Sequence, residues 1–133
     1  MPDMAQSETP LLDASWVEIA AAEDVLEAGH GWRFPVQSIW GPGTAFIVRY
    51  AGKVYGYLNQ CAHVPIELDW QPGQFFDAAG LYLICATHGA CYEPDTGHCI
   101  AGPCRGKQLH KIDVIEQAGK IYWRPNEKFK LLV

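Results

Sequence analysis

The feature that most constrains this chain is a pair of short clusters, Cys61-Ala62-His63 and Cys85-Ala86-Thr87-His88. Each cluster offers one thiolate and one imidazole, so a tight loop can direct both donors at the same small object. The 21 residues between His63 and Cys85 allow two such loops to face each other. Two cysteines and two histidines in this order fit either a tetrahedral zinc site or a [2Fe–2S] centre in which two histidines replace two cysteines on one iron.

The zinc alternative is the weaker one on spacing alone. Structural zinc loops usually carry two cysteines separated by two to four residues, and the chain has no such pair at the clusters. Cys61 and Cys85 are each followed by a histidine instead. A zinc-stabilised interaction module is therefore kept only as an alternative.

Residues around the clusters resemble those of one known family, the Rieske [2Fe–2S] proteins. The resemblance extends from about residue 16 to residue 123. It is carried by Cys61-x-His63, Cys85-x-x-His88-Gly89, Tyr92 and Gly102-Pro103, in that order. The gap between the two clusters is somewhat longer than is usual in the family, which suggests a small insertion near residues 70–80.

The resemblance implies a role for each of these residues. One [2Fe–2S] cluster would be bound by Cys61, His63, Cys85 and His88. The Tyr92 hydroxyl would form a hydrogen bond with a ligand thiolate, and Pro103 would lie in a loop that covers the cluster. The remaining histidines, His30, His98 and His110, have no partner ligand at a suitable spacing and are interpreted as ordinary polar residues.

Two departures from the family pattern indicate which branch the chain resembles. Ala90 stands where high-potential members carry a serine, which implies a potential in the lower part of the range of about −150 to +300 mV. High-potential members also join their ligand loops by a disulfide, and the corresponding positions here are Ile66 and Thr87. The chain therefore resembles the soluble, ferredoxin-type branch.

Three further cysteines, Cys91, Cys99 and Cys104, are not needed as ligands. No basic segment followed by an apolar stretch opens the chain, and no window approaches the roughly 20 apolar residues of a membrane helix. We therefore predict a soluble cytoplasmic protein without a membrane partner. In a reducing compartment the three cysteines are expected to be thiols rather than a disulfide.

The charge of the chain argues against a nucleic-acid partner. Its 133 residues carry a net charge of −5, and it lacks any run of lysine or arginine that would attract nucleic acid or anionic lipid. The length and the 49% content of hydrophobic residues suit one globular domain.

Glycine and proline turns divide the chain into short extended runs. Residues 1–14 are predicted to be a flexible tail and 15–133 a single domain, with a cluster-binding part at about 58–105. One helical turn is predicted at 20–28, and Gly41-Pro42-Gly43 is predicted to break the chain. The predicted strands are 15–19, 32–36, 44–50, 54–59, 81–84, 90–93, 98–100, 109–116 and 121–123. This pattern predicts an all-β fold, an antiparallel sandwich or barrel. The resemblance implies a Rieske-like domain with a small subdomain made of two ligand loops.

The resemblance implies a non-catalytic carrier of single electrons. The family's terminal oxygenases need a second, much larger domain with its own iron site, for which 133 residues leave no room. No G-x-G-x-x-G segment occurs, so nicotinamide or flavin would belong to a separate reductase that donates the electrons. The acceptor would be an oxygenase or another redox protein. The alternatives are a small subunit of a nitrite-reductase-like enzyme and a redox or iron–sulfur sensor.

Overall fold

The computed structural model describes residues 14–62, 66–69, 71–87, 89–104 and 106–131. They form two antiparallel sheets and one short 3₁₀ helix, η1 (Ala22–Asp24). The strands are β1 (Val17–Ala21), β2 (Trp32–Ser38), β3 (Gly41–Tyr50), β4 (Lys53–Leu58), β5 (Leu83–Ile84), β6 (Cys91–Tyr92), β7 (Cys99–Ala101), β8 (Lys111–Gln117), β9 (Lys120–Arg124) and β10 (Phe129–Leu131). No helix in the described part of the chain is long and apolar enough to cross a membrane.

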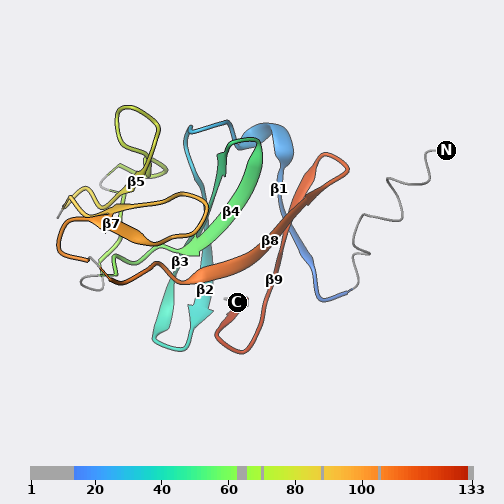
Figure 1. Cartoon of the computed structure of the whole chain (residues 1–133). Helices are drawn as coiled ribbons and strands as arrows, with labels where there is room; N and C mark the ends of the chain where they lie inside the picture. Colours follow the sequence, from blue (N-terminus) through green and yellow to red (C-terminus); the bar gives the residue numbers. More distant parts are fainter. Residues whose placement is uncertain (1–13, 63–65, 70, 88, 105, 132–133) are drawn as a thin grey trace.

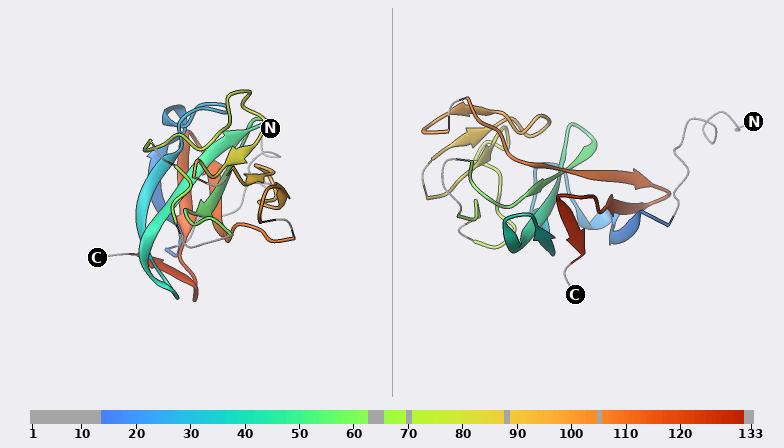
Figure 2. Two further views of the ribbon diagram at one scale, coloured as in Figure 1. Left: turned by 90° about the vertical axis from the view of Figure 1, so that its left-hand side faces the viewer. Right: turned by 90° about the horizontal axis from the view of Figure 1, so that it is seen from below.

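The larger sheet has seven strands in the order β1-β9-β8-β4-β3-β2-β10. It is strongly curled, so that its strands wrap around an apolar interior (Figures 1 and 2). The smaller sheet, β5-β6-β7, lies at one end of the larger one, beside the ends of β3 and β4. The predicted all-β architecture is therefore confirmed.

Two hairpins of the larger sheet are closed by the same kind of turn. Ala51 and Gly52 join β3 to β4, and Ala118 and Gly119 join β8 to β9; all four residues have φ between +52° and +83°. Positive φ at both central residues is the geometry of a type I′ turn, which matches the twist of paired strands. At the first turn, the Glu27 carboxylate accepts hydrogen bonds from the Ala51 and Gly52 amides at 2.6 and 2.9 Å.

Alternation along β3 divides the interior into two apolar clusters. Ala45 and Ile47 face one cluster, inside the curled sheet, whereas Phe46 and Val48 face the other. This second cluster also contains Cys61, Cys85 and Tyr92 together with residues of the 66–83 segment. The period of two in a strand thus connects the core of the large sheet to the region of the predicted ligand loops.

The predicted helical turn over 20–28 is wrong except at Ala22–Asp24. The Arg49 side chain donates hydrogen bonds to the carbonyls of Ala22 and Val25, at 3.1 and 2.8 Å. Glu27 in turn forms a parallel bridge with Arg49. Because these backbone groups bond to β3, they are not available for a longer helix.

The predicted break at residues 41–43 is also wrong, since β3 begins at Gly41. Pairing between β3 and β4 starts at Ala45, and the Thr44 carbonyl accepts a hydrogen bond from the Asn59 amide just beyond β4, so residues 41–43 pair with β2 alone. Pro42 is tolerated at such a position because its missing amide can face the side without a ladder partner. Strand β10 was not predicted, and it depends on pairing with β2, which lies far away in the chain.

Candidate metal centre

Both predicted cysteine ligands begin loops of the same construction. The Cys61 amide donates a hydrogen bond to the Ile66 carbonyl at 2.7 Å, and the Cys85 amide donates one to the Ala90 carbonyl at 2.8 Å. Each bond therefore closes a loop from a cysteine to the residue five positions later. The second loop is tightened further by a 2.8 Å bond from the Gly89 amide to the Cys85 carbonyl. Both side chains are buried, with 2% and 0% of their surface exposed.

The two loops are held together by the segment between them. The Ala86 amide, next to Cys85, donates a hydrogen bond to the Leu68 carbonyl at 3.0 Å. Leu68 lies two residues beyond the end of the first loop and is fully buried in the same apolar cluster as both cysteines. The segment after the first loop is therefore bonded directly to the start of the second loop.

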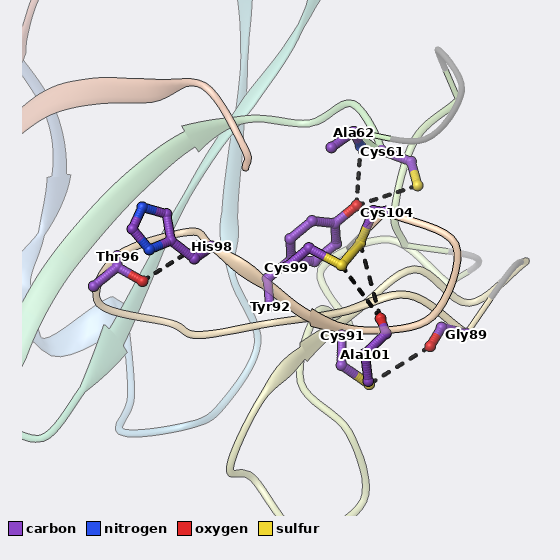
Figure 3. Close-up of a disulfide and its surroundings, with 10 residues drawn as sticks. All are labelled: Cys61, Ala62, Gly89, Cys91, Tyr92, Thr96, His98, Cys99, Ala101 and Cys104. Atoms are coloured by element: carbon purple, nitrogen blue, oxygen red, sulfur yellow. Dashed lines mark hydrogen bonds between the residues drawn. A yellow bond between two sulfur atoms is a disulfide. The ribbon is translucent and has the colours of Figure 1, made fainter. Parts of the chain in front are cut away.

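Tyr92, on β6, reaches the first loop through its hydroxyl group (Figure 3). The hydroxyl oxygen accepts a hydrogen bond from the Ala62 amide at 2.9 Å and lies 3.3 Å from Cys61 Sγ. Burial raises the pKa of Tyr92, and the hydrogen bond with Cys61 raises it further. The phenol therefore stays protonated and can donate to a thiolate at position 61. The predicted contact between Tyr92 and a cysteine is present.

A buried polar network, missed by the sequence reasoning, supports the first loop. Asn59, just before the loop, donates to Asp69 Oδ1 at 2.8 Å and accepts from the Leu68 amide at 2.8 Å. Asp69 Oδ2 accepts from the Gly73 amide at 2.9 Å and lies 3.5 Å from Arg33 Nε. No sequence pattern pairs these residues, because they belong to three separate segments.

The Gly102-Pro103 turn passes directly over the second loop. Gly102 has a φ of +93°, and a Cβ added there would lie 2.9 Å from the Ala90 Cα. Only glycine allows this approach, so the turn is pressed against the residue that closes the second loop. Pro103 itself is exposed in this turn. Its covering role remains a prediction.

The turn is closed by a disulfide between Cys99 and Cys104, whose Cα atoms lie 5.7 Å apart (Figure 3). The expectation that the spare cysteines are thiols is therefore wrong for this pair and holds for Cys91. The expectation of free thiols assumed a reducing compartment. In the structure, β7 and the turn after it bring the Cys99 and Cys104 side chains within bonding distance. A spacing of five residues around a Gly-Pro turn was the available signal.

The described residues thus place two of the four predicted ligands, Cys61 and Cys85, in one buried cluster with Tyr92. His63 and His88 lie outside the described residues. Among the residues that are described, no group of three or more histidine, cysteine, aspartate or glutamate side chains could hold a metal ion. Two buried cysteine side chains, one in each loop, match the two thiolates that a Rieske-type [2Fe–2S] centre takes from cysteine.

A sequence model of the Rieske [2Fe–2S] domain matches residues 15–128 of the chain. The chain belongs to this family. Rieske domains bind one [2Fe–2S] cluster, which is therefore the cofactor of this Rieske chain. The family resemblance inferred from the two Cys–His motifs is confirmed.

Solved structures with the same fold include both ferredoxins and oxygenases. The ferredoxin of carbazole 1,9a-dioxygenase from Nocardioides aromaticivorans IC177 matches with a TM-score of 0.65 and 23% identity, over 85% of this Rieske chain and 100% of the ferredoxin. A chain in a complex of reduced oxygenase and oxidized ferredoxin in carbazole 1,9a-dioxygenase gives 0.63 and 20%, over 84% and 94%. The terminal oxygenase of carbazole 1,9a-dioxygenase from Novosphingobium sp. KA1 gives 0.64 and 21%, over 85% of this chain and 30% of the oxygenase. A search of curated proteins gave no match.

Proposed function

We propose that the chain is a one-electron carrier that takes electrons from a reductase and passes them to an acceptor such as an oxygenase. Its cluster would be bound by Cys61 and Cys85 on one iron and by His63 and His88 on the other. The observation that carries the proposal is the pair of equivalent loops, each closed from a buried cysteine to the residue five positions later.

The extent of the matches supports a carrier rather than an enzyme. The chain covers all of the Nocardioides ferredoxin but only 30% of the Novosphingobium oxygenase. Another matching chain comes from a complex of reduced oxygenase and oxidized ferredoxin in carbazole 1,9a-dioxygenase. The complex shows a ferredoxin bound directly to an oxygenase. We infer the same pair of partners here, a reductase as donor and an oxygenase or other redox protein as acceptor.

When bound, a cluster with two histidine ligands accepts and returns one electron at about −150 to +300 mV. The residues of the chain hold the thiolates in a buried, preorganised setting. The Tyr92 hydroxyl accepts a hydrogen bond from the Ala62 amide, and it would donate its proton to Cys61 Sγ when Cys61 is a thiolate. Ala90 has no hydroxyl to offer and is fully buried, which favours the lower part of the potential range.

Metal analysis of protein from iron-replete cells tests the proposal. We expect two irons and two acid-labile sulfides per chain, a red-brown colour, and uptake of one electron per chain in a reductive titration. Cys61→Ser and Cys85→Ser should lose the cluster, whereas Cys91→Ser, a matched change at a thiol outside the ligand loops, should keep it. A colourless protein with one zinc per chain would refute the proposal.

The other predicted roles, a subunit of a nitrite-reductase-like enzyme and a redox sensor, gain no specific support from the described residues. The predicted cytoplasmic location also stays a prediction, and disulfides such as Cys99–Cys104 are uncommon in that compartment.

A further inference from the structure

Two large apolar side chains stand out at the tip of the β2–β3 hairpin. Ile39 and Trp40 expose 60% and 51% of their surface. The backbone beneath them is fixed, because the Ser38 hydroxyl donates to the Gly41 carbonyl at 2.9 Å and accepts from the Trp40 amide at 3.1 Å. The tip is therefore a rigid turn that presents an isoleucine and a tryptophan to solvent.

The Trp40 ring rests on His110, with the ring centroids 4.5 Å apart, and lies 6.4 Å from the Phe129 ring. His110 and Cys61 line the same hollow of about 240 Å³, together with Gln60, Ala62, Lys107 and Gln108. Phe129 lines a second hollow, of about 450 Å³. Trp40 thus lies between two depressions, and the first of them leads to a predicted ligand.

The charge of this surface is opposite to that of the whole chain. Lys107 lines the first hollow, and Lys111 and Lys128 line the second, where Glu127 is the acidic side chain. Three lysines against one glutamate stand out in a chain whose net charge is −5. Burial, and secondarily the charge of Lys128, lower the pKa of His110, so the imidazole is neutral at pH 7. We call Ile39, Trp40, Lys107, Lys111 and Lys128 the Trp40 patch.

We propose that the Trp40 patch is the docking surface for an acidic redox protein. An apolar recess of that protein would cover Trp40, and its carboxylates would lie against the lysines. The proposal rests on the proposed electron-carrier function, and it names the chemistry of one partner. Tryptophan is enriched among the side chains that dominate binding energy at interfaces. Complementary charge accelerates encounter and orients the partner. A protein docked here would lie over the hollow that reaches Cys61.

Small redox ions test the charge of the patch. Reduced protein is mixed in a stopped-flow apparatus with hexacyanoferrate(III), which takes one electron and is anionic, or with hexaammineruthenium(III), which takes one electron and is cationic. At low ionic strength we expect Lys107→Glu/Lys128→Glu to slow the first reaction by about tenfold and to accelerate the second. Both effects should vanish at about 1 M salt.

The matched control is Lys53→Glu/Lys120→Glu, which changes the net charge by the same amount. Lys53 and Lys120 lie at the turns that open β4 and β9. These turns are at the opposite ends of β4 and β8 from Cys61 and His110, about 20 Å away at the rise of a β-strand. Equal slowing of hexacyanoferrate(III) reduction by both double variants would overturn the proposal.

The apolar part of the patch needs a protein probe. Reduced plant-type ferredoxin, an acidic donor with a potential of about −400 mV, can pass one electron to the oxidised protein. Trp40→Ala should slow this transfer severalfold and leave the rate with hexacyanoferrate(III) unchanged, because only a protein covers the indole. Unchanged transfer from the ferredoxin would overturn the assignment of Trp40.

Paramagnetic mapping does not depend on any variant. Hexacyanochromate(III), an anion that exchanges no electron here, should broaden the NMR signals of Lys107, Lys128 and the Trp40 indole first. Broadening centred elsewhere would overturn the proposal. Absence of a cluster or of electron uptake would instead refute the electron-carrier function, so the two failures are distinguishable.

Discussion

At the scale of single residues, the chemistry of the site depends on how one hydroxyl group is oriented. Tyr92 has two partners in the first ligand loop, the Ala62 amide and Cys61 Sγ. A thiolate at position 61 carries no proton, so in that state the hydroxyl group is the donor and the sulfur is the acceptor. With a cluster bound, reduction would place more negative charge on the thiolates and would strengthen a hydrogen bond donated by Tyr92.

Tyr92→Phe should therefore lower the midpoint potential. A hydrogen bond to a charged group is worth about 1.5 to 3 kcal/mol. If the bond is stronger in the reduced state by a fraction of that energy, the midpoint potential changes by tens of millivolts. The measurement is protein-film voltammetry. Tyr57→Phe is the matched control, because Tyr57 is equally buried and donates to the Pro94 carbonyl instead. Equal potentials for wild type and Tyr92→Phe would show that the hydroxyl does not donate to Cys61.

At the scale of elements, the predicted ligand loops are held in position by segments outside them. Asp69 joins the chain before the first loop, through Asn59, to the turn at Gly73. Gly73 is itself bonded to the large sheet, because its carbonyl accepts from the Gly31 amide at 2.7 Å. The region where an insertion was inferred from the sequence is therefore part of the support of the site.

Asp69→Ala should destabilise the protein by about 3 kcal/mol, because it leaves the Asn59 and Gly73 donors buried without an acceptor. Chemical denaturation followed by circular dichroism measures the loss. The matched control is Glu67→Ala, since Glu67 also binds Arg33, at 3.1 Å, but is exposed. Its loss should stay within about 1 kcal/mol. Equal losses would assign the effect to Arg33 rather than to the buried network.

The disulfide is a second device at this scale, since Cys99 and Cys104 close the turn that lies on Ala90. Cys99→Ser/Cys104→Ser should lower the free energy of unfolding by about 2 kcal/mol, the chain-entropy value for so short a loop. It should also accelerate cluster loss, measured as bleaching of visible absorbance in chelator. Cys91→Ser is the control and should bleach like wild type. Unchanged bleaching in the double variant would show that the turn does not protect the cluster.

At the scale of the whole molecule, the sequence predicted what depends on local pattern. Strands with clear alternation, such as β8, were found because their signals are contained in a few residues. The short gaps between the predicted strands 44–50 and 54–59, and between 109–116 and 121–123, contain the turns at Ala51-Gly52 and Ala118-Gly119. The predicted roles of Cys61, Cys85 and Tyr92 came from the family resemblance. Three contacts were missed because each joins separate segments of the chain. They are the Arg49 hydrogen bonds to the segment predicted as helical, the Asn59–Asp69 pair and the Trp40–His110 contact.

Tyrosines in the apolar core shared by the large sheet and the predicted ligand loops make the free energy of unfolding depend on pH. Tyr57 and Tyr92 are fully buried in it, and burial is the largest cause that raises the pKa of each above its ordinary value of 10.0. Above pH 10 the unfolded chain releases phenolic protons that the folded protein retains. The folded state then binds more protons, so stability must fall as pH rises, by up to about 1.4 kcal/mol per pH unit for each tyrosine.

We therefore expect the urea midpoint to fall steeply from pH 10 to 11.5. Tyr57→Phe should make the slope shallower, because phenylalanine has no proton to retain, whatever the variant costs in stability at pH 8. Tyr122→Phe, at a partly exposed tyrosine on β9, is the control and should leave the slope unchanged. A urea midpoint that stays constant to pH 11.5 would mean that neither buried phenol resists ionisation. It would also mean that water enters the apolar core between the large sheet and the predicted ligand loops.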